Sequence, residues 1–368
     1  MTAARNPFTP TFGVVPPVMA GRDELLMRMR SAFENGLGDP NLSTIIIGAR
    51  GTGKTALLSC IADEAQQAGW LAVNVVASEG MLEDILQRAM ESASEIAPSD
   101  SGRHITGIDL AQIIGIQWET DKPYEANWRT RMNALFAELA SHDVGLLVTV
   151  DEVKASIDEM LQLVSTYQLF VREGKKVALV MAGLPKHVSS LVSNQDVSFL
   201  RRSRQHYLSR IGIADVKSAF ARTVESAGKT ICAEALQLAA DSIGGFPYMM
   251  QLVGYFTWLE AFESLSINLE HVKRGVQLAR EDLDSGVLNA TYRELSEGDR
   301  TFLRAMLADA ETSRLANVAR RMGKPNGYAS TYKSRLADQG IIEELPDGSL
   351  AFAIPFFREY VERISAEQ

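Results

Sequence analysis

Residues 48–55 form a glycine-rich segment, GARGTGKT, whose composition and spacing are typical of a phosphate-binding loop. Glycines allow a tight turn whose backbone N–H groups point at phosphate oxygens, and a following helix adds its positive N-terminal end. We expect Lys54 to reach the β and γ phosphates and the Thr55 hydroxyl to bind Mg²⁺, with ATP as the nucleotide. The predicted nucleotide-binding residues of this segment are Gly48, Ala49, Arg50, Gly51, Thr52, Gly53, Lys54, Thr55 and Ala56.

A second group that could do chemistry is a pair of carboxylates at the end of the apolar run VGLLVTVDE, residues 144–152. The carboxyl end of a strand in an open α/β sheet faces the ligand crevice. We therefore expect Asp151 to hold the Mg²⁺ shell and Glu152 to orient and deprotonate an attacking water. A solvated acidic turn is the plain alternative for the pair alone. The upstream glycine-rich loop favours the chemical interpretation, and the two motifs together predict ATP hydrolysis.

The elements that must position these residues follow from the hydrophobic pattern. Between residues 43 and 183 the chain alternates strand-like apolar runs with helical runs, which predicts βαβ units and a mainly parallel sheet. The strand-like run before the glycine-rich loop and the helical run after it are the context that the loop requires, so a mere glycine turn is disfavoured. Residues 104–118 fit poorly as helix, and we predict an inserted hairpin there.

Beyond residue 212 the strand signal disappears and helical periods follow one another, which predicts an all-helical second domain. The last segment has three helical runs and then two short strand-like runs joined by Pro346-Asp347-Gly348, the order of a winged helix. The predicted organisation is an N-terminal arm (1–20), a P-loop α/β domain (21–211), a helical domain (212–290) and a winged-helix domain (291–368).

The composition limits the class of protein. A chain of 368 residues with 46% hydrophobic content can bury a large core and smaller ones. Its two cysteines, Cys60 and Cys232, have no paired spacing that indicates a disulfide framework or a metal site. Prolines interrupt the first twenty residues, so neither a signal peptide nor a membrane span is expected, and we predict a cytoplasmic protein. The net charge of −9 argues against an overall nucleic-acid coat protein.

These motifs and their order resemble the AAA+ ATPases, in particular the origin-recognition and archaeal-type ATPase branch near the STAND NTPases. The resemblance covers almost the whole chain and includes VMAGRDE at residues 18–24, AGLP at 182–185 and GGFP at 244–247. It implies that the helical domain is a lid, that Val18 to Arg22 lie against the adenine, and that Pro247 lies near the nucleotide. It also implies charge-neutralising arginines near Arg201 and Arg202, which would act at a neighbouring subunit's γ-phosphate. ATP bridging two subunits would make homo-oligomerisation depend on nucleotide.

Two departures from the family pattern lower the expected rate of hydrolysis. Ala182-Gly183 occupies the place where many AAA+ proteins carry a polar residue that holds the water. Pro247-Tyr248 stands where many relatives carry a second arginine. We therefore expect slow or partner-stimulated turnover.

The interval from Arg314 to Arg335 contains six basic residues and no Asp or Glu, and it covers the second and third helical runs of the winged-helix pattern. In helix-turn-helix proteins these two helices meet double-stranded DNA. The predicted DNA-binding residues are Arg320, Arg321, Lys324, Tyr328, Thr331, Lys333 and Arg335.

Two alternative functions stay open. In the first, the protein is a STAND-like signalling switch whose C-terminal domain binds a protein partner, which the acidic wing residues Glu343, Glu344 and Asp347 would suit. In the second, it is a P-loop kinase or small-molecule transferase, which would need an acceptor pocket. The carboxylate pair and the winged-helix pattern argue against the transferase.

Overall fold

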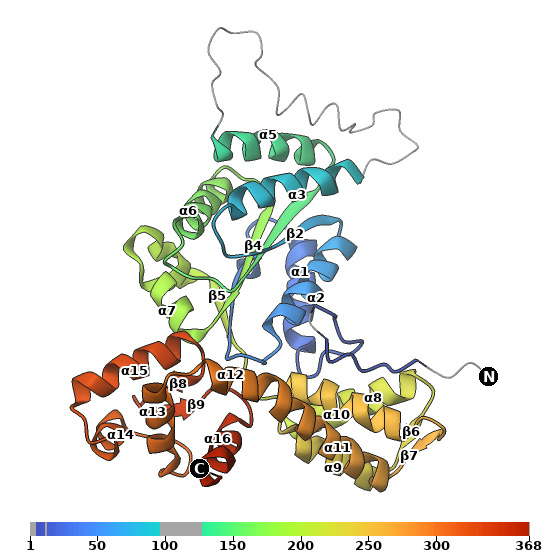
Figure 1. Cartoon of the computed structure of the whole chain (residues 1–368). Coiled ribbons are helices and arrows are strands. Elements are labelled where there is room, and N and C mark those ends of the chain that lie inside the picture. Colours follow the sequence, from blue (N-terminus) through green and yellow to red (C-terminus); the bar gives the residue numbers. More distant parts are fainter. Residues whose placement is uncertain (1–4, 12, 96–126, 368) are drawn as a thin grey trace. The chain divides into compact units, whose positions relative to one another are not determined.

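A computed structural model describes residues 5–11, 13–95 and 127–367 of the chain (Figure 1). The predicted hairpin at residues 104–118 lies outside these ranges. Two compact units are distinguished. The sheet unit comprises residues 23–47 and 54–207, and the helical unit comprises residues up to Arg22, the loop Gly48–Gly53 and residues from Leu208 onward.

The sheet unit is built on five parallel strands, as the alternating pattern predicts. Its strands are β1 (Ser43–Ile47), β2 (Trp70–Val76), β3 (Gly145–Asp151), β4 (Val177–Gly183) and β5 (Arg204–Tyr207). Their order across the sheet is β2-β3-β4-β1-β5. Consecutive residues of β3 and β4 are buried, because both faces of the sheet are covered by helices.

The helices of the sheet unit pack on both faces of the sheet. They are α1 (Asp23–Asn35), α2 (Lys54–Gln67), α3 (Met81–Glu95), α5 (Trp128–Ser141), α6 (Asp158–Arg172), α7 (Pro185–Ser193) and the short 3-10 helices Pro40–Leu42 and Gln195–Arg202. On one face α3, α5 and α6 bury alternate strand residues such as Ile45, Val148 and Leu179. The intervening residues, among them Ile46 and Leu147, are equally buried on the face where α2 packs.

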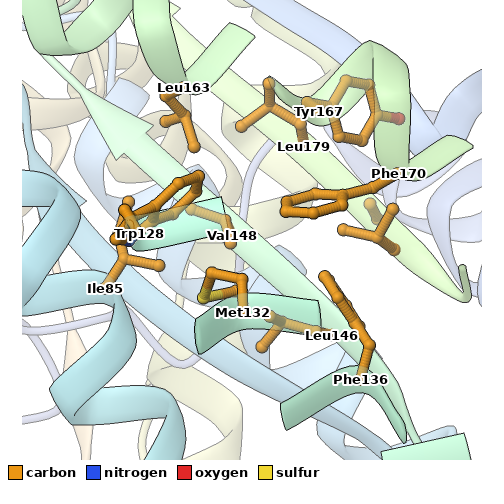
Figure 2. A pocket seen from close by; sticks show the side chains of 12 residues that line it. Ile85, Trp128, Met132, Phe136, Leu146, Val148, Leu163, Tyr167, Phe170 and Leu179 are labelled. Atoms are coloured by element: carbon orange, nitrogen blue, oxygen red, sulfur yellow. The ribbon is translucent and has the colours of Figure 1, made fainter. Parts of the chain in front are cut away.

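A small apolar cavity remains inside the first of these layers (Figure 2). The rings of Trp128, Phe136 and Phe170 face it from α5 and α6, over the β3 residues Leu146 and Val148. Its volume is about 10 Å³, which is at the lower limit for a single water. Because its lining is apolar, the cavity is a packing defect and not a ligand site.

The helical unit begins with α8 (Ile213–Ser226), α9 (Ala233–Ile243), α10 (Pro247–Glu260) and α11 (Leu269–Leu283), as the helical periods predict. A two-strand ladder joins β6 (Thr230–Ile231) to β7 (Ser266–Ile267). A π-helical turn, Asp284–Leu288, then leads into α12 (Asn289–Glu294). Gly244 ends α9 in the left-handed conformation and Pro247 opens α10, so the GGFP segment is a tight turn between two helices.

The N-terminal arm belongs to the core of the helical unit. The Phe8 side chain is 2% exposed and packs against Phe220, with ring centroids 4.9 Å apart. Gly254 of α10 leaves the space for it, because a Cβ there would lie 2.1 Å from the Phe8 ring. The compact part of the chain therefore begins well before Gly21, where the sequence pattern had placed its start.

The C-terminal segment has the predicted order of elements within the helical unit. Its helices are α13 (Glu297–Leu307), α14 (Leu315–Arg321) and α15 (Asn326–Asp338), followed by β8 (Ile342–Glu344), β9 (Leu350–Phe352) and α16 (Phe357–Ala366). The two strands are antiparallel, and a bridge from Ser313 to Leu350 extends the pair. One hydrophobic cluster runs from Phe8 through α8–α11 to Val361, so the predicted boundary at residue 290 crosses a shared core. None of the helices in the described ranges is both long and apolar enough to cross a membrane.

Candidate nucleotide site

The strand register aligns the residues that precede the site. Ile47 at the end of β1 pairs with Gly183 of β4 and with Tyr207 of β5. Val150 pairs with Met181, so Asp151 lies one step from the same edge of the sheet. The carboxyl ends of the strands therefore present the end of β1 and the acidic pair at one edge, where α/β sheets bind ligands.

Within the sheet unit, the Thr55 hydroxyl and Asp151 are in direct contact. Lys54 and Thr55 are the first two residues of α2, and the Thr55 hydroxyl donates a 2.5 Å hydrogen bond to Asp151 Oδ2. Asp151 Oδ1 accepts a bond from the Glu152 N–H at 2.8 Å. A hydroxyl and a carboxylate oxygen thus converge on one point, which fits a Mg²⁺ ion that takes one or two protein oxygens and completes its octahedron with phosphate and water. Among the described residues there is no cluster of three or more His, Cys, Asp or Glu side chains that could hold a metal without such help.

Glu152 has an uncommon backbone conformation. Its φ is +54°, which for a residue other than glycine is a rare, strained value. The chain is fixed on both sides, because Asp151 accepts the Glu152 N–H and the buried Val153 donates its N–H to the Ala182 carbonyl at 3.0 Å. The exposed Glu152 side chain is thereby held at the end of β3, as a residue that acts on a water must be.

The strand next to Asp151 carries no polar side chain at its end. Ala182 and Gly183 close β4, and a Cβ on Gly183 would lie 2.8 Å from Val153 Cγ2. The apolar Val153 side chain thus occupies the space that a polar residue at 183 would need. The sequence pattern did not reveal Val153, because an apolar residue after an acidic pair carries no signal of its own.

In the helical unit, the glycine-rich loop lies beside Pro247, one of the predicted nucleotide contacts. Gly51 and Gly53 have φ values of +76° and +84°, which suit glycine alone. A Cβ on Gly53 would lie 3.5 Å from Pro247 Cγ, so Pro247 borders the loop. Thr52 shapes the loop from within, since its hydroxyl donates to the Ala49 carbonyl at 2.9 Å.

Arg22 is held beside the GGFP turn. Its guanidinium donates to the Ser209 carbonyl at 3.2 Å, and burial lowers its pKa from the usual value while Asp215 opposes that shift. Ile211 connects this group to the turn, because its N–H donates to the Gly245 carbonyl at 2.9 Å. The predicted adenine segment and the GGFP turn thus flank the same short stretch of chain.

Arg201 and Arg202 lie at the opposite edge of the sheet. They precede β5, whose first residue, Arg204, pairs with Thr44 near the start of β1. The four residues of β5, at about 3.3 Å each, place the two arginines roughly 13 Å from the carboxyl edge of the sheet. The fold does not bring these two arginines to the acidic pair of their own chain.

The basic residues of the C-terminal segment are largely compensated. Arg321 forms a two-pronged pair with Asp309, Lys333 contacts Glu344 at 3.0 Å, and Arg335 contacts the buried Asp299 at 2.6 Å. The three carboxylates lie outside the interval 314–335, so a count of charges along this interval did not reveal the pairs. Among the described residues, no carboxylate pairs with Arg320 or Lys324.

Two further predicted DNA contacts lie on α15. Tyr328 is 43% exposed, and its hydroxyl is 2.9 Å from that of Tyr332. The Lys324 ammonium lies 5.5 Å from the Tyr328 ring. The Thr331 hydroxyl is turned back to the Gly327 carbonyl at 3.4 Å.

Comparison with known proteins finds a family similar to the central region. Residues 39–192 match a family model described as an AAA domain. Residues 285–361 match a family described as "Domain of unknown function (DUF8462)". No curated protein matches the sequence significantly.

Solved structures resemble the chain over nearly its full length. The Walker-type ATPase PABY2304 of Pyrococcus abyssi has a TM-score of 0.63 at 13% identity, covering 94% of this chain and 96% of that one. The ORC2 protein of Aeropyrum pernix in ADPNP–ADP complexes has a TM-score of 0.61 at 16% identity, covering 97% of both chains. At such identities the likeness shows a shared fold.

Proposed function

We propose that the protein binds ATP with Mg²⁺ through its AAA domain and hydrolyses it slowly, so that the bound nucleotide acts as a switch. The observation that carries this proposal is the convergence of Thr55 and Asp151, with the strained Glu152 beside them at the carboxyl edge of the sheet. A buried structural pair would not need an exposed glutamate held at positive φ. Strained residues of this kind concentrate at active sites.

Each residue has a distinct role in the proposed reaction. The backbone N–H groups of the loop 48–53 and the Lys54 ammonium bind the phosphates. Thr55 and Asp151 would hold Mg²⁺, which would neutralise phosphate charge when bound. Glu152 orients the water and takes its proton. Arg22 borders the base, and Pro247 borders the loop.

Two features support slow turnover in an isolated chain. Val153 fills the place beside Gly183, so no polar side chain from β4 can help to hold the water. Arg201 and Arg202 stand at the far edge of the sheet, so an arginine from this pair acts only at a neighbouring subunit's site. Catalytic arginines supplied from outside a site raise rates by about 10³- to 10⁵-fold in other NTPases. We propose that assembly on ATP is what completes the site.

The test is steady-state phosphate release by the purified protein and by Lys54→Ala. We expect low activity in the wild type, none above background in the variant, and free phosphate as the product. Phosphate transfer to an added small-molecule acceptor, without free phosphate, would instead identify a transferase.

For the C-terminal segment we propose a winged helix that contacts double-stranded DNA through α14 and α15, in the nucleotide-bound assembly. Its support is the order of three helices and an antiparallel strand pair, with Arg320 exposed and Lys324 exposed beside Tyr328. A protein-binding role, as in a STAND-like switch, is the second candidate. The ion pairs of Arg321, Lys333 and Arg335 favour it, because they leave few cations for phosphates.

A further inference from the structure

A cavity of about 90 Å³ lies within the helical unit, beside the glycine-rich loop. Its walls come from the glycine-rich loop, the start of α10, the π-helical turn with α12, and the segment between β9 and α16. The lining residues are Arg50, Gly51, Phe246, Tyr248, Met249, Leu283, Val287, Leu288, Thr291, Ile354, Pro355 and Phe356.

The size of the cavity suits a small molecule. One water needs about 10–15 Å³ of such space, so the enclosed part has room for roughly six water molecules or more, against one in the cavity of the sheet unit. Together with the open space at its mouth the hollow measures about 510 Å³. A body of one or two rings would fill it.

The lining specifies an apolar ligand with one anionic group. Most of the wall is aliphatic or aromatic, and the Thr291 hydroxyl is already committed to the Val287 carbonyl at 2.8 Å. The exposed Arg50 is the one charged side chain in the lining, and none of the described residues forms an ion pair with it. A guanidinium at an apolar cavity recognises a carboxylate, sulfonate or phosphate, often through two parallel hydrogen bonds.

Two irregularities of the backbone lie in the cavity wall. The turn Asp284–Leu288 is π-helical, and such turns occur frequently at functional sites. Phe356 has φ +60°, and its ring is fixed between Phe246, at a centroid distance of 5.6 Å, and the Arg280 guanidinium, at 4.9 Å. Strain of this kind is typical of ligand clamps.

We propose that this cavity binds a small effector with a planar apolar body and a single anionic group, and that Arg50 binds the anionic group. Pro355 lies against Gly51, with 3.9 Å between its Cγ and a Cβ built on the glycine, so a ligand here adjoins the phosphate-binding loop directly. An occupied cavity would thereby alter nucleotide affinity. This last consequence rests on the proposed function, whereas binding to the cavity does not.

The test uses naphthalene-2-sulfonate, a planar two-ring body with one anionic group, and follows its binding to the folded protein by isothermal titration calorimetry. We expect one saturable site. Val287→Trp, which fills the cavity from its exposed rim, should weaken binding at least tenfold. Arg50→Gln should weaken binding of the sulfonate at least fivefold but that of neutral 2-naphthol less than twofold.

Controls separate this site from others. Leu265→Ser, at an exposed apolar residue outside the cavity lining, should leave the sulfonate affinity unchanged, and thermal melts verify that each variant is folded. Lys54→Ala should still bind the probe, so a failure of the nucleotide proposal leaves this one testable. Unchanged affinity in Val287→Trp, loss of binding in Leu265→Ser, or complete competitive displacement by Mg²⁺–ADP would each overturn the proposal.

Discussion

At the scale of single residues, the candidate site could be proposed from the sequence because each of its groups belongs to a contiguous motif. The glycine-rich loop and the Asp151-Glu152 pair are recognised within a few residues each, and the structure joins them through Thr55. Val153 and the partners of the basic residues were not readable, because they act through contacts between distant parts of the chain. The burial of Phe8 was not predicted for the same reason, since Gly254 creates the space for its ring.

One residue-scale prediction concerns the thiol of Cys60 in α2. Burial, with added repulsion from Asp63 and Glu64, raises the pKa of Cys60 to about 11. Since the thiolate is the reactive form, alkylation by iodoacetamide at pH 8 should be on the order of 100-fold slower than for the same cysteine in the urea-unfolded chain. The rate should rise as the pH approaches 11. Peptide mass spectrometry over time measures it, and equally fast labelling in the folded and unfolded chains would contradict the assigned environment.

At the scale of elements, hydrophobic periodicity predicted the alternation of strands and helices in the sheet unit and the run of helices beyond residue 212, but α5 and α7 were not predicted. The π-helical turn was not predicted, because a helical period continues through it without a break. The pairing of basic side chains was also missed, since a count along the chain cannot show carboxylates that the fold brings to α14 and α15.

The Arg335–Asp299 ion pair joins α15 to the start of α13. Asp299 is 3% exposed and also accepts from Ser296, so removing Arg335 leaves a buried carboxylate without its cation. Arg335→Ala should lower the free energy of unfolding by about 1–3 kcal/mol, discounted for the partly exposed arginine. Urea unfolding measures the loss, with Arg320→Ala, whose side chain has no carboxylate partner in the described chain, as the matched control. Equal stability of the two variants would refute the assigned role.

The proposed DNA binding gives a second prediction at this scale. If Arg320 and Lys324 are the cations that meet phosphates, the logarithm of the affinity should fall with the logarithm of salt concentration with a slope of about −2, because each neutralised phosphate contributes about −0.9. Fluorescence anisotropy with a labelled duplex gives this slope, and Arg320→Gln with Lys324→Gln should abolish it. A slope of −5 or steeper would require the paired residues as well. No binding at all would favour the protein-partner alternative.

At the scale of the whole molecule, the separation of Arg201 and Arg202 from the acidic pair predicts cooperation between chains. A Lys54→Ala chain keeps its arginines and loses its own site, whereas an Arg201→Ala/Arg202→Ala chain keeps its site and loses the arginines. Mixed in equal amounts, two inactive variants should recover a measurable fraction of wild-type hydrolysis. If the Arg201→Ala/Arg202→Ala variant alone hydrolysed ATP at the wild-type rate, a role of these two residues in hydrolysis would be excluded.

The measurement that tests the central claim most directly is the identity of the nucleotide retained by Glu152→Gln after incubation with Mg²⁺–ATP. The amide keeps the size of the side chain but cannot take a proton from water, so we predict that the variant retains intact ATP while the wild type retains ADP. Retention of ADP by both proteins, or hydrolysis at the wild-type rate by the variant, would contradict the assignment of Glu152 and with it the proposed ATPase site.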